Sequence, residues 1–317
     1  MIGIKGLRRQ TPILRTKRLL VFVSMALAML LALASCVSVD TTPPEPPEYV
    51  FDDLGRLVAI NGTPQRIVSL APSNTEILFA LGLGNKVVGV TDWCDYPPEA
   101  LDKEKVGGYV TSDIEKIVAL NPDLILAAHG LPLEVIDTLE GLGLTVFGIK
   151  TTDLDDLLND IRRVGEITDK EVEALALTSE MESRIKAVTD ATSELEERPK
   201  VFYIVSHDPL WTVGSGTFIQ ELIEKGGGLN ICQDITGYTT ISIEEVVARN
   251  PEIITASEWS YDWAKNATEL LGTNASQEGR IYTVDDDLVQ RPGPRIVDGL
   301  EWFAYFIHPE ISEEPED

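Results

Sequence analysis

The chain has 317 residues, a formal net charge of −26 at neutral pH and a hydrophobic content of 44%. This hydrophobic content is enough for two domain-sized cores and excludes a chain that is disordered throughout. The acidic excess argues against nucleic acid as a partner, because phosphate backbones are bound by Lys and Arg.

The first 35 residues have the layout of a secretory signal peptide. Six basic residues and no acidic residue precede an apolar run of sixteen residues from Leu19 to Ala34. A bilayer span needs roughly 20 apolar residues, so residues 1–35 favour a signal peptide over a membrane helix. The following Leu33-Ala34-Ser35-Cys36 resembles the lipobox of bacterial lipoproteins, which predicts lipidation of Cys36. The alternative is an ordinary signal peptide followed by a chance cysteine.

Residues 36–48 are rich in Pro and polar residues and predict an extended tether between this anchor and the folded part. Loss of the leader would change the net charge from −26 to −26 − 6 = −32. We therefore expect an extracytoplasmic monomer that is anchored to the cell membrane by Cys36 and held off the bilayer by its tether. The remaining cysteines, Cys94 and Cys232, lie in different halves of the chain, and we expect two free thiols.

The sequence then forms two similar halves. Residues 114–128 read IEKIVALNPDLILAA and residues 243–257 read IEEVVARNPEIITAS, an offset of 243 − 114 = 129. The Gly-Tyr pairs that end in Tyr109 and Tyr238 stand at the same offset. A long period with only two copies predicts two similar lobes, because solenoids need more and shorter repeats.

The first lobe is expected over residues 49–167. Residues 49–62 predict a hairpin, and short β-branched runs at 66–70, 86–91, 123–128 and 145–150 predict buried parallel strands. Helical patterns separate them. One helix opens with a capping box, Ser73-x-x-Glu76, and ends at Gly82, and another begins at Pro132. Alternation of strands and helices predicts an α/β lobe.

Residues 168–198 predict one long, rigid helix that joins the lobes. A second capping box, Thr168-x-x-Glu171, opens it, and no Gly or Pro interrupts it before Pro199. About thirty residues at 1.5 Å per residue give a length of about 45 Å. The alternative is an ordinary helix that packs on one lobe.

The second lobe is expected over residues 199–309, with an acidic tail at 310–317. Its predicted strands are 200–206, 252–257 and 281–287, and its predicted helices are 217–227 and 296–307. The predicted fold class is α/β, with two similar Rossmann-like lobes, one linking helix and a ligand cleft between the lobes.

No catalytic or metal-binding motif accompanies this fold. P-loop, HExxH, GxSxG and CxxC patterns are absent from the sequence. His129 and His207 follow predicted strands, whose carboxyl ends face the ligand crevice in α/β sheets. A dedicated metal site needs three or four converging ligands, and no third ligand is recognisable. The sequence therefore predicts a protein that is not an enzyme, with no metal site and no cofactor.

Aromatic residues follow several of the predicted strands. The candidates are Trp93, Tyr109, Trp211, Tyr238, Trp259 and Tyr261. Core packing would explain a single Trp, but six aromatic residues at the crevice edge with acidic neighbours favour a binding surface. Such a surface suits a large flat or bulky ligand.

Residues 66–100, 107–126 and 241–254 together resemble the helical-backbone substrate-binding proteins of bacterial ABC importers, which take up cobalamin, haem and iron chelates. APSNTE followed by CDYPPEA is most similar to the cobalamin-binding branch. The resemblance covers residues 49–309. It implies a ligand held between the lobes by Pro72, Ser73, Trp93, Tyr109, Trp211, Tyr238 and the loop of Asp287 and Arg291. Members of that branch often have Trp where this chain has Tyr109 and Tyr238, which leaves the ligand's identity open.

Glu115 and Glu244 open the repeated helices at equivalent places. An acid in the first turn stabilises a helix through its dipole, and this ordinary role explains either residue alone. Two equivalent acids also match the two identical sites of a dimeric permease. The resemblance implies that both contact the ABC permease dimer, which works with its ATPase subunits.

The leading hypothesis is a lipid-anchored binding protein that delivers cobalamin or another corrinoid to an ABC permease. The nearest alternative binds haem, through an axial His or Tyr, or a ferric siderophore. An extracytoplasmic enzyme using Cys94 or a histidine is a different class, and so is a surface adhesin. Cys94 lies beside two acids with no activating cation in view, which argues against the enzyme.

Overall fold

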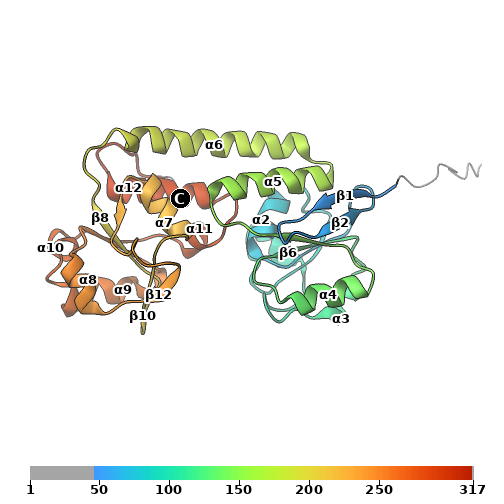
Figure 1. The fold of residues 1–317 in the computed structure, drawn as a ribbon, viewed down its shortest axis with the longest axis horizontal. Helices are drawn as coiled ribbons and strands as arrows, with labels where there is room; N and C mark the ends of the chain where they lie inside the picture. The colour runs from blue at the N-terminus through green and yellow to red at the C-terminus, as the bar shows by residue number, and fades with distance from the viewer. Residues whose placement is uncertain (1–45, 316–317) are drawn as a thin grey trace, which may run out of the picture. The chain divides into compact units, whose positions relative to one another are not determined.

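The computed structural model describes residues 46–315. The predicted leader, Cys36 and residues 36–45 of the predicted tether lie outside the described residues. Among residues 46–315, no helix has the length and apolar content that a membrane crossing requires. The described part contains two parallel sheets with flanking helices, in agreement with the predicted α/β fold class (Figure 1).

The first lobe contains a five-stranded parallel sheet. Its strand order is β5-β4-β3-β6-β7. The strands are β3 (Ile67–Ser69), β4 (Val87–Val90), β5 (Glu104–Lys105), β6 (Leu124–Ala128) and β7 (Val146–Ile149). The helices are α2 (Pro72–Ala80), η1 (Pro98–Asp102), α3 (Ile114–Ala119), α4 (Leu133–Gly141) and α5 (Leu154–Thr168). The predicted hairpin is present as the antiparallel strands β1 (Glu48–Phe51) and β2 (Leu57–Ile60).

The second lobe contains a four-stranded parallel sheet of order β11-β8-β13-β14. Its strands are β8 (Lys200–Ile204), β11 (Leu229–Asn230), β13 (Ile253–Ala256) and β14 (Ile281–Thr283). The helices are α7 (Phe218–Lys225), α8 (Ile243–Arg249), α9 (Glu258–Asn266), η2 (Thr268–Leu270), α10 (Asn274–Glu278), α11 (Asp286–Gln290) and α12 (Ile296–Ile307). The sequence did not predict a second, antiparallel sheet formed by β9 (Ser206–His207), β10 (Leu210–Val213) and β12 (Tyr238–Thr240), in the order β12-β10-β9.

The repeated sequence forms the same helix-turn-strand unit in both lobes. Asp113 caps α3 by accepting from the backbone N of Lys116, and Ser242 caps α8 in the same way. Both helices are followed by an Asn with positive φ, Asn121 at 47° and Asn250 at 48°. Asn tolerates this left-handed conformation, and the following Pro prevents the helix from continuing. The local sequence thus dictates the repeated unit.

The linking helix α6 spans Glu171–Ser193 and is shorter than predicted. Thr168 does not cap it: Thr168 is the last residue of α5, and its hydroxyl donates to the carbonyl of Val164. Asp169, with a φ of 59°, makes the turn between the two helices. The 23 residues of α6 correspond to about 35 Å of helix. The expected capping box is therefore wrong, because Thr168 satisfies its hydroxyl within the preceding helix.

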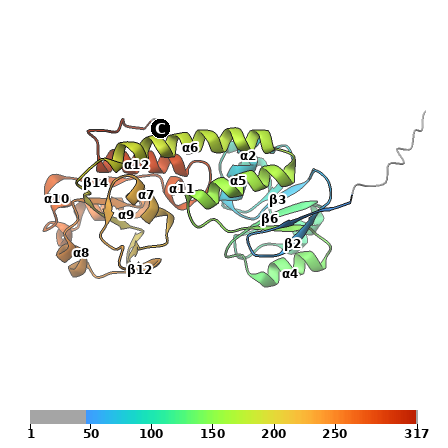
Figure 2. The same cartoon turned by 45° about the horizontal axis from the view of Figure 1, so that its top comes forward.

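Helix α6 packs against α5 of the first lobe and α12 of the second, and Figure 2 shows it lying along both. At the α5 contact, a Cβ on Gly165 would lie 2.5 Å from the Cβ of Ala174, so the close approach requires glycine. At the α12 contact, Arg184 donates to Glu301 at 2.6 Å and to Asp298 at 2.6 Å. One helix thus has specific contacts with both lobes. Cys94 and Cys232 are buried free thiols, as expected.

Candidate ligand-binding site

A cavity of about 260 Å³ lies where the first lobe's strands end, beside the segment that follows α11. It brings together four of the predicted ligand-binding residues, Pro72, Ser73, Tyr109 and Arg291. The other lining residues are Ala71, Asn74, Ala128, His129, Ile149, Thr151, Gln290 and Pro292. Residues that are more than 130 positions apart in the sequence (290 − 151 = 139) thus share one cavity.

Helix α2 begins at this cavity. Ala71 is the extended N-cap residue, and Pro72 occupies the first turn, where its fixed φ suits a helix start. The predicted capping box is wrong, because no side chain caps α2. Instead, the Glu76 carboxylate accepts two hydrogen bonds from Arg295, at 2.6 and 3.1 Å. A long-range ion pair has replaced the local contact.

Tyr109 is fixed against the end of β6. Its hydroxyl donates to the carbonyl oxygen of His129. A Cβ at Gly130, whose φ is 99°, would lie 3.2 Å from the Tyr109 hydroxyl oxygen, so glycine provides both the turn and the space. Burial raises the pKa of the Tyr109 hydroxyl. The ring is therefore a neutral, positioned wall of the cavity.

Trp211 and Tyr238 lie on neighbouring strands of the antiparallel sheet. Val213 pairs with Tyr238 and Trp211 pairs with Thr240, which puts both aromatic side chains on one face of the sheet. Their exposed fractions are 38% and 51%. Burial raises the pKa of the Tyr238 hydroxyl. The antiparallel sheet therefore presents two partly exposed rings together, which the predicted strands did not reveal.

Four of the predicted aromatic residues, Trp93, Trp211, Tyr238 and Trp259, are not among the lining residues of this cavity. Trp93 is 66% exposed and Trp259, in the first turn of α9, is 79% exposed. Of the histidines, His129 lines the cavity, whereas His207 stacks on Trp263 with ring centroids 5.3 Å apart. A ligand role for Trp93 and Trp259 stays a prediction.

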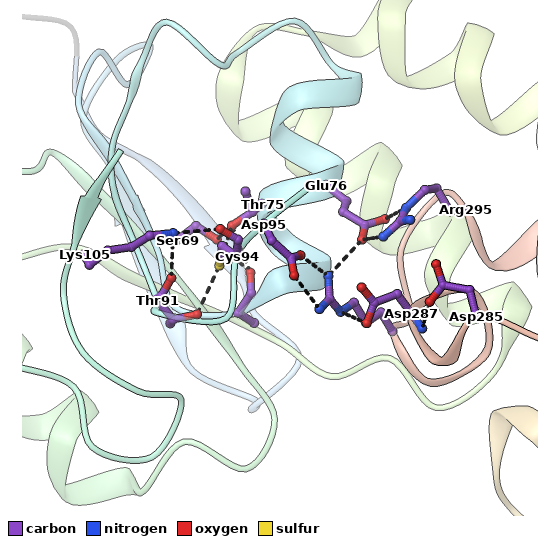
Figure 3. A network of polar contacts seen from close by, with 12 residues as sticks. Ser69, Thr75, Glu76, Thr91, Cys94, Asp95, Lys105, Asp285, Asp287 and Arg295 are labelled. Atoms are coloured by element: carbon purple, nitrogen blue, oxygen red, sulfur yellow. Dashed lines mark hydrogen bonds and ion pairs between the residues drawn. The ribbon is translucent and has the colours of Figure 1, made fainter. Parts of the chain in front are cut away.

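Asp287 and Arg291 lie in and just after the short helix α11, and not in a loop as expected. The Arg291 guanidinium is bound by three carboxylates. Its Nε lies 2.8 Å from Asp287, and its Nη1 lies 2.6 Å from Asp95 and 3.9 Å from Glu76. Figure 3 shows these acids converging from α2, from the segment after β4 and from α11. Sequence reasoning missed the roles of Glu76 and Asp95, because nothing local pairs them with residues about 200 positions away.

Burial and the neighbouring arginines shift the pKa values of these acids in opposite directions. The hydrogen bond from Arg291 is the main reason why the pKa of Asp95 is lowered. Burial raises the pKa of Glu76 although Arg295 opposes the shift, and burial also raises the pKa of Asp287. Arg295 also stacks on Tyr96, with its guanidinium carbon 3.7 Å from the ring centroid. The network therefore joins residues of both lobes at the edge of the cavity.

A second cavity of about 670 Å³ lies beside this network, among Phe79, Tyr96, Lys103 and Arg295. It is larger, but it contains none of the predicted ligand-binding residues. Among residues 46–315, no three His, Cys, Asp or Glu side chains are grouped so that they could hold a metal ion.

Comparison with known proteins identifies the family of this chain. A family model described as periplasmic binding protein matches residues 67–288. The chain belongs to this family. Its members are substrate-binding components of transport systems and not enzymes. The fold and the two-lobe organisation predicted from the sequence agree with that membership.

Three similar proteins show the range of the family. An uncharacterised ABC transporter substrate-binding lipoprotein, YvrC of Bacillus subtilis, is 35% identical over 84% of this chain and 88% of its own length. The crystal structure of the vitamin B12 binding protein BtuF of Vibrio cholerae has a TM-score of 0.70 and 31% identity, and the match covers 78% of this chain and 97% of that one. The haem-binding protein RhuT of Roseiflexus sp. has a TM-score of 0.71 and 27% identity over 78% of this chain and 99% of its own. The relatives of this periplasmic binding protein thus include an ABC transporter substrate-binding lipoprotein and binding proteins for vitamin B12 and for haem.

Proposed function

We propose that this protein captures cobalamin or a related corrinoid outside the cytoplasm and delivers it to an ABC permease. The observation that carries the proposal is the aromatic surface that Tyr109 of the first lobe and Trp211 and Tyr238 of the second provide. Tyr109 lines the cavity, and Tyr238 lies beside Trp211. The likeness to a vitamin B12 binding protein supports the same reading.

The aromatic surface is large enough to hold such a ligand. One aromatic side chain buries up to about 200 Å². If Trp93, Tyr109, Trp211 and Tyr238 each bury half of that, the gain at about 25 cal/mol/Å² is about 10 kcal/mol before the costs of association. A broad, largely apolar macrocycle can contact several such rings, whereas a small inorganic ion cannot.

Haem is the second candidate, and one observation favours it. His129 and Tyr109 both line the cavity, and either residue type is an axial ligand of haem iron in other proteins. The likeness to RhuT supports the same alternative.

The proposal includes two partners at the membrane. Cys36 would be lipidated and anchor the protein, in line with the lipoprotein relative YvrC. Glu115 and Glu244 would contact the permease dimer. Both acids are exposed in the first turns of α3 and α8, and no ion pair within the described residues involves either one. Exposed acids of this kind contribute mainly orientation and salt-sensitive docking.

Titration with cobalamin, haem and a ferric chelate tests the proposal. We expect one-to-one binding of cobalamin that is tighter than binding of the other two, measured by calorimetry and by quenching of tryptophan fluorescence. In the Tyr109→Ala, Tyr238→Ala double variant the affinity should fall at least about 100-fold, since roughly 100 Å² of contact is lost at each ring. The Tyr109→Phe, Tyr238→Phe variant is the matched control, because it keeps both rings. Preference for haem, or an unchanged affinity in the alanine variant, would contradict the proposal.

A further inference from the structure

Beside the aromatic surface, the site contains a set of carboxylates that surround Arg291. Arg291 is the one cationic side chain among the lining residues of the cavity. An accessible arginine at this position would attract a ligand carboxylate through a bidentate contact. The charges of the groups around Arg291 therefore influence whether the cavity binds a charged or a neutral ligand.

The guanidinium is already occupied by protein carboxylates. Nε donates to Asp287, and the two terminal nitrogens donate to Asp95, at 2.6 and 3.4 Å. Glu76 lies 3.9 Å from Nη1 and is itself bound by Arg295. All three guanidinium nitrogens of Arg291 thus face carboxylates of the protein, and the Arg291 side chain is only 17% exposed.

The network carries a net negative charge. Its acids are Glu76, Asp95, Asp285 and Asp287, and its bases are Arg291, Arg295 and Lys105, whose ammonium donates to the carbonyl of Cys94, so the formal sum is 3 − 4 = −1 (Figure 3). Asp95 is anionic at neutral pH, because the hydrogen bond from Arg291 holds its pKa below the usual range. Asp286, the next residue along α11, adds a further acid that hydrogen-bonds Gln290. A carboxylate on the ligand would therefore meet repulsion here.

We infer that Asp95, by neutralising Arg291 together with Asp287 and Glu76, makes this binding site select amide-bearing macrocycles over carboxylate-bearing ones. The corrin ring of cobalamin carries side chains that end in neutral amides, whereas haem carries two carboxylates. The neutral amide can still accept or donate a hydrogen bond at Ser73, Gln290 or Thr151 without adding charge. This inference rests on the proposed function and adds a specificity determinant to it.

Asp95 is the residue to change, because its side chain is 52% exposed and its loss should not unfold the protein. The probes are cobalamin and its three isomeric monocarboxylates, in which one side-chain amide is hydrolysed. Cobalamin and each monocarboxylate differ by one charge and have nearly the same shape. The affinity ratio of the amide to the acid isolates the electrostatic contribution at each position.

We expect the wild-type protein to bind cobalamin more tightly than the monocarboxylate whose acid faces the network. Removal of one charge near the ligand acid, in a partly screened site, changes the ratio about tenfold. Asp95→Asn should therefore reduce the ratio about tenfold for that isomer, with the affinity for cobalamin measured on the same variant as the reference. The control is Asp137→Asn, which removes the same charge from an exposed position of α4.

The outcomes separate this inference from the proposed function. If cobalamin binds but no ratio changes in Asp95→Asn, the specificity role of Asp95 is wrong and the proposed function stands. An equal change in Asp137→Asn would show a general effect of net charge and would also overturn the inference. If the wild-type protein binds neither cobalamin nor any of its acids, the proposed function fails, and the inference fails with it.

Discussion

The ion pair between Glu76 and Arg295 offers a direct test of the physical account of the site. The Glu76 carboxylate is 2% exposed and accepts two hydrogen bonds from Arg295. Removing one partner of a buried pair leaves the other charge uncompensated, at a cost of about 3–5 kcal/mol. Arg291 remains 3.9 Å away as a weaker partner, so the lower end of that range applies. We expect Arg295→Ala to lower the free energy of unfolding by about 3 kcal/mol at neutral pH.

The loss should depend on pH with a defined sign. Burial raises the pKa of Glu76 above its usual value of 4.5, and loss of Arg295 raises it further. A group whose folded pKa is raised contributes stability below its unfolded pKa and loses that contribution as the pH rises through the folded value. The deficit of Arg295→Ala should therefore be largest near pH 7.5 and shrink as the pH falls towards 4.5.

Urea unfolding followed by tryptophan fluorescence at the two pH values measures this deficit. Arg184→Ala is the matched control, because Arg184 also binds two carboxylates but these are 30% and 38% exposed, and exposed pairs contribute about 1 kcal/mol or less. The double variant Glu76→Gln, Arg295→Met should recover most of the loss. A deficit in Arg295→Ala no larger than that of Arg184→Ala, or one that grows on acidification, would show that Arg295 does not stabilise a buried Glu76 carboxylate.

Three further predictions follow from the structure and the sequence. Burial, followed by the neighbouring Asp53, raises the pKa of Asp160 to about 8, so the stability that its neutral form contributes is lost as the pH rises through that value. Asp160→Asn should therefore stabilise the protein by about 1–2 kcal/mol at pH 8.5 and not at pH 4. Thermal unfolding at both pH values will check this. Glu115→Ala with Glu244→Ala should leave corrinoid binding nearly intact and strongly reduce uptake by cells; wild-type uptake at limiting carrier concentration would exclude the docking role. Cys36→Ala should yield an unlipidated precursor, and normal incorporation of labelled fatty acid into that variant would exclude the anchor.

Features that depend on neighbouring residues could be predicted from the sequence. The buried strands are continuous β-branched runs, and the closing helix predicted over 296–307 is α12, Ile296–Ile307. The doubled segments form matching units because each carries its own cap at Asp113 or Ser242 and its own stop at Asn121 or Asn250. Hydrophobic period, caps and stops act within a few residues, so they can be interpreted from one chain.

Features that depend on partners distant in the sequence could be seen only in the folded chain. Ser73-x-x-Glu76 and Thr168-x-x-Glu171 fit the capping-box pattern, yet neither forms a cap. Arg295, 219 positions away, binds Glu76 more strongly than a local backbone N–H could, because two charges meet where water is excluded. The site likewise needed the fold to bring Asp95 to Arg291 across 196 positions and to set Trp211 beside Tyr238 on strands too short to predict. The candidate aromatic residues could be predicted from the sequence. Only the folded chain shows that Arg291, which lines the same cavity as Tyr109, is already paired with carboxylates of the protein.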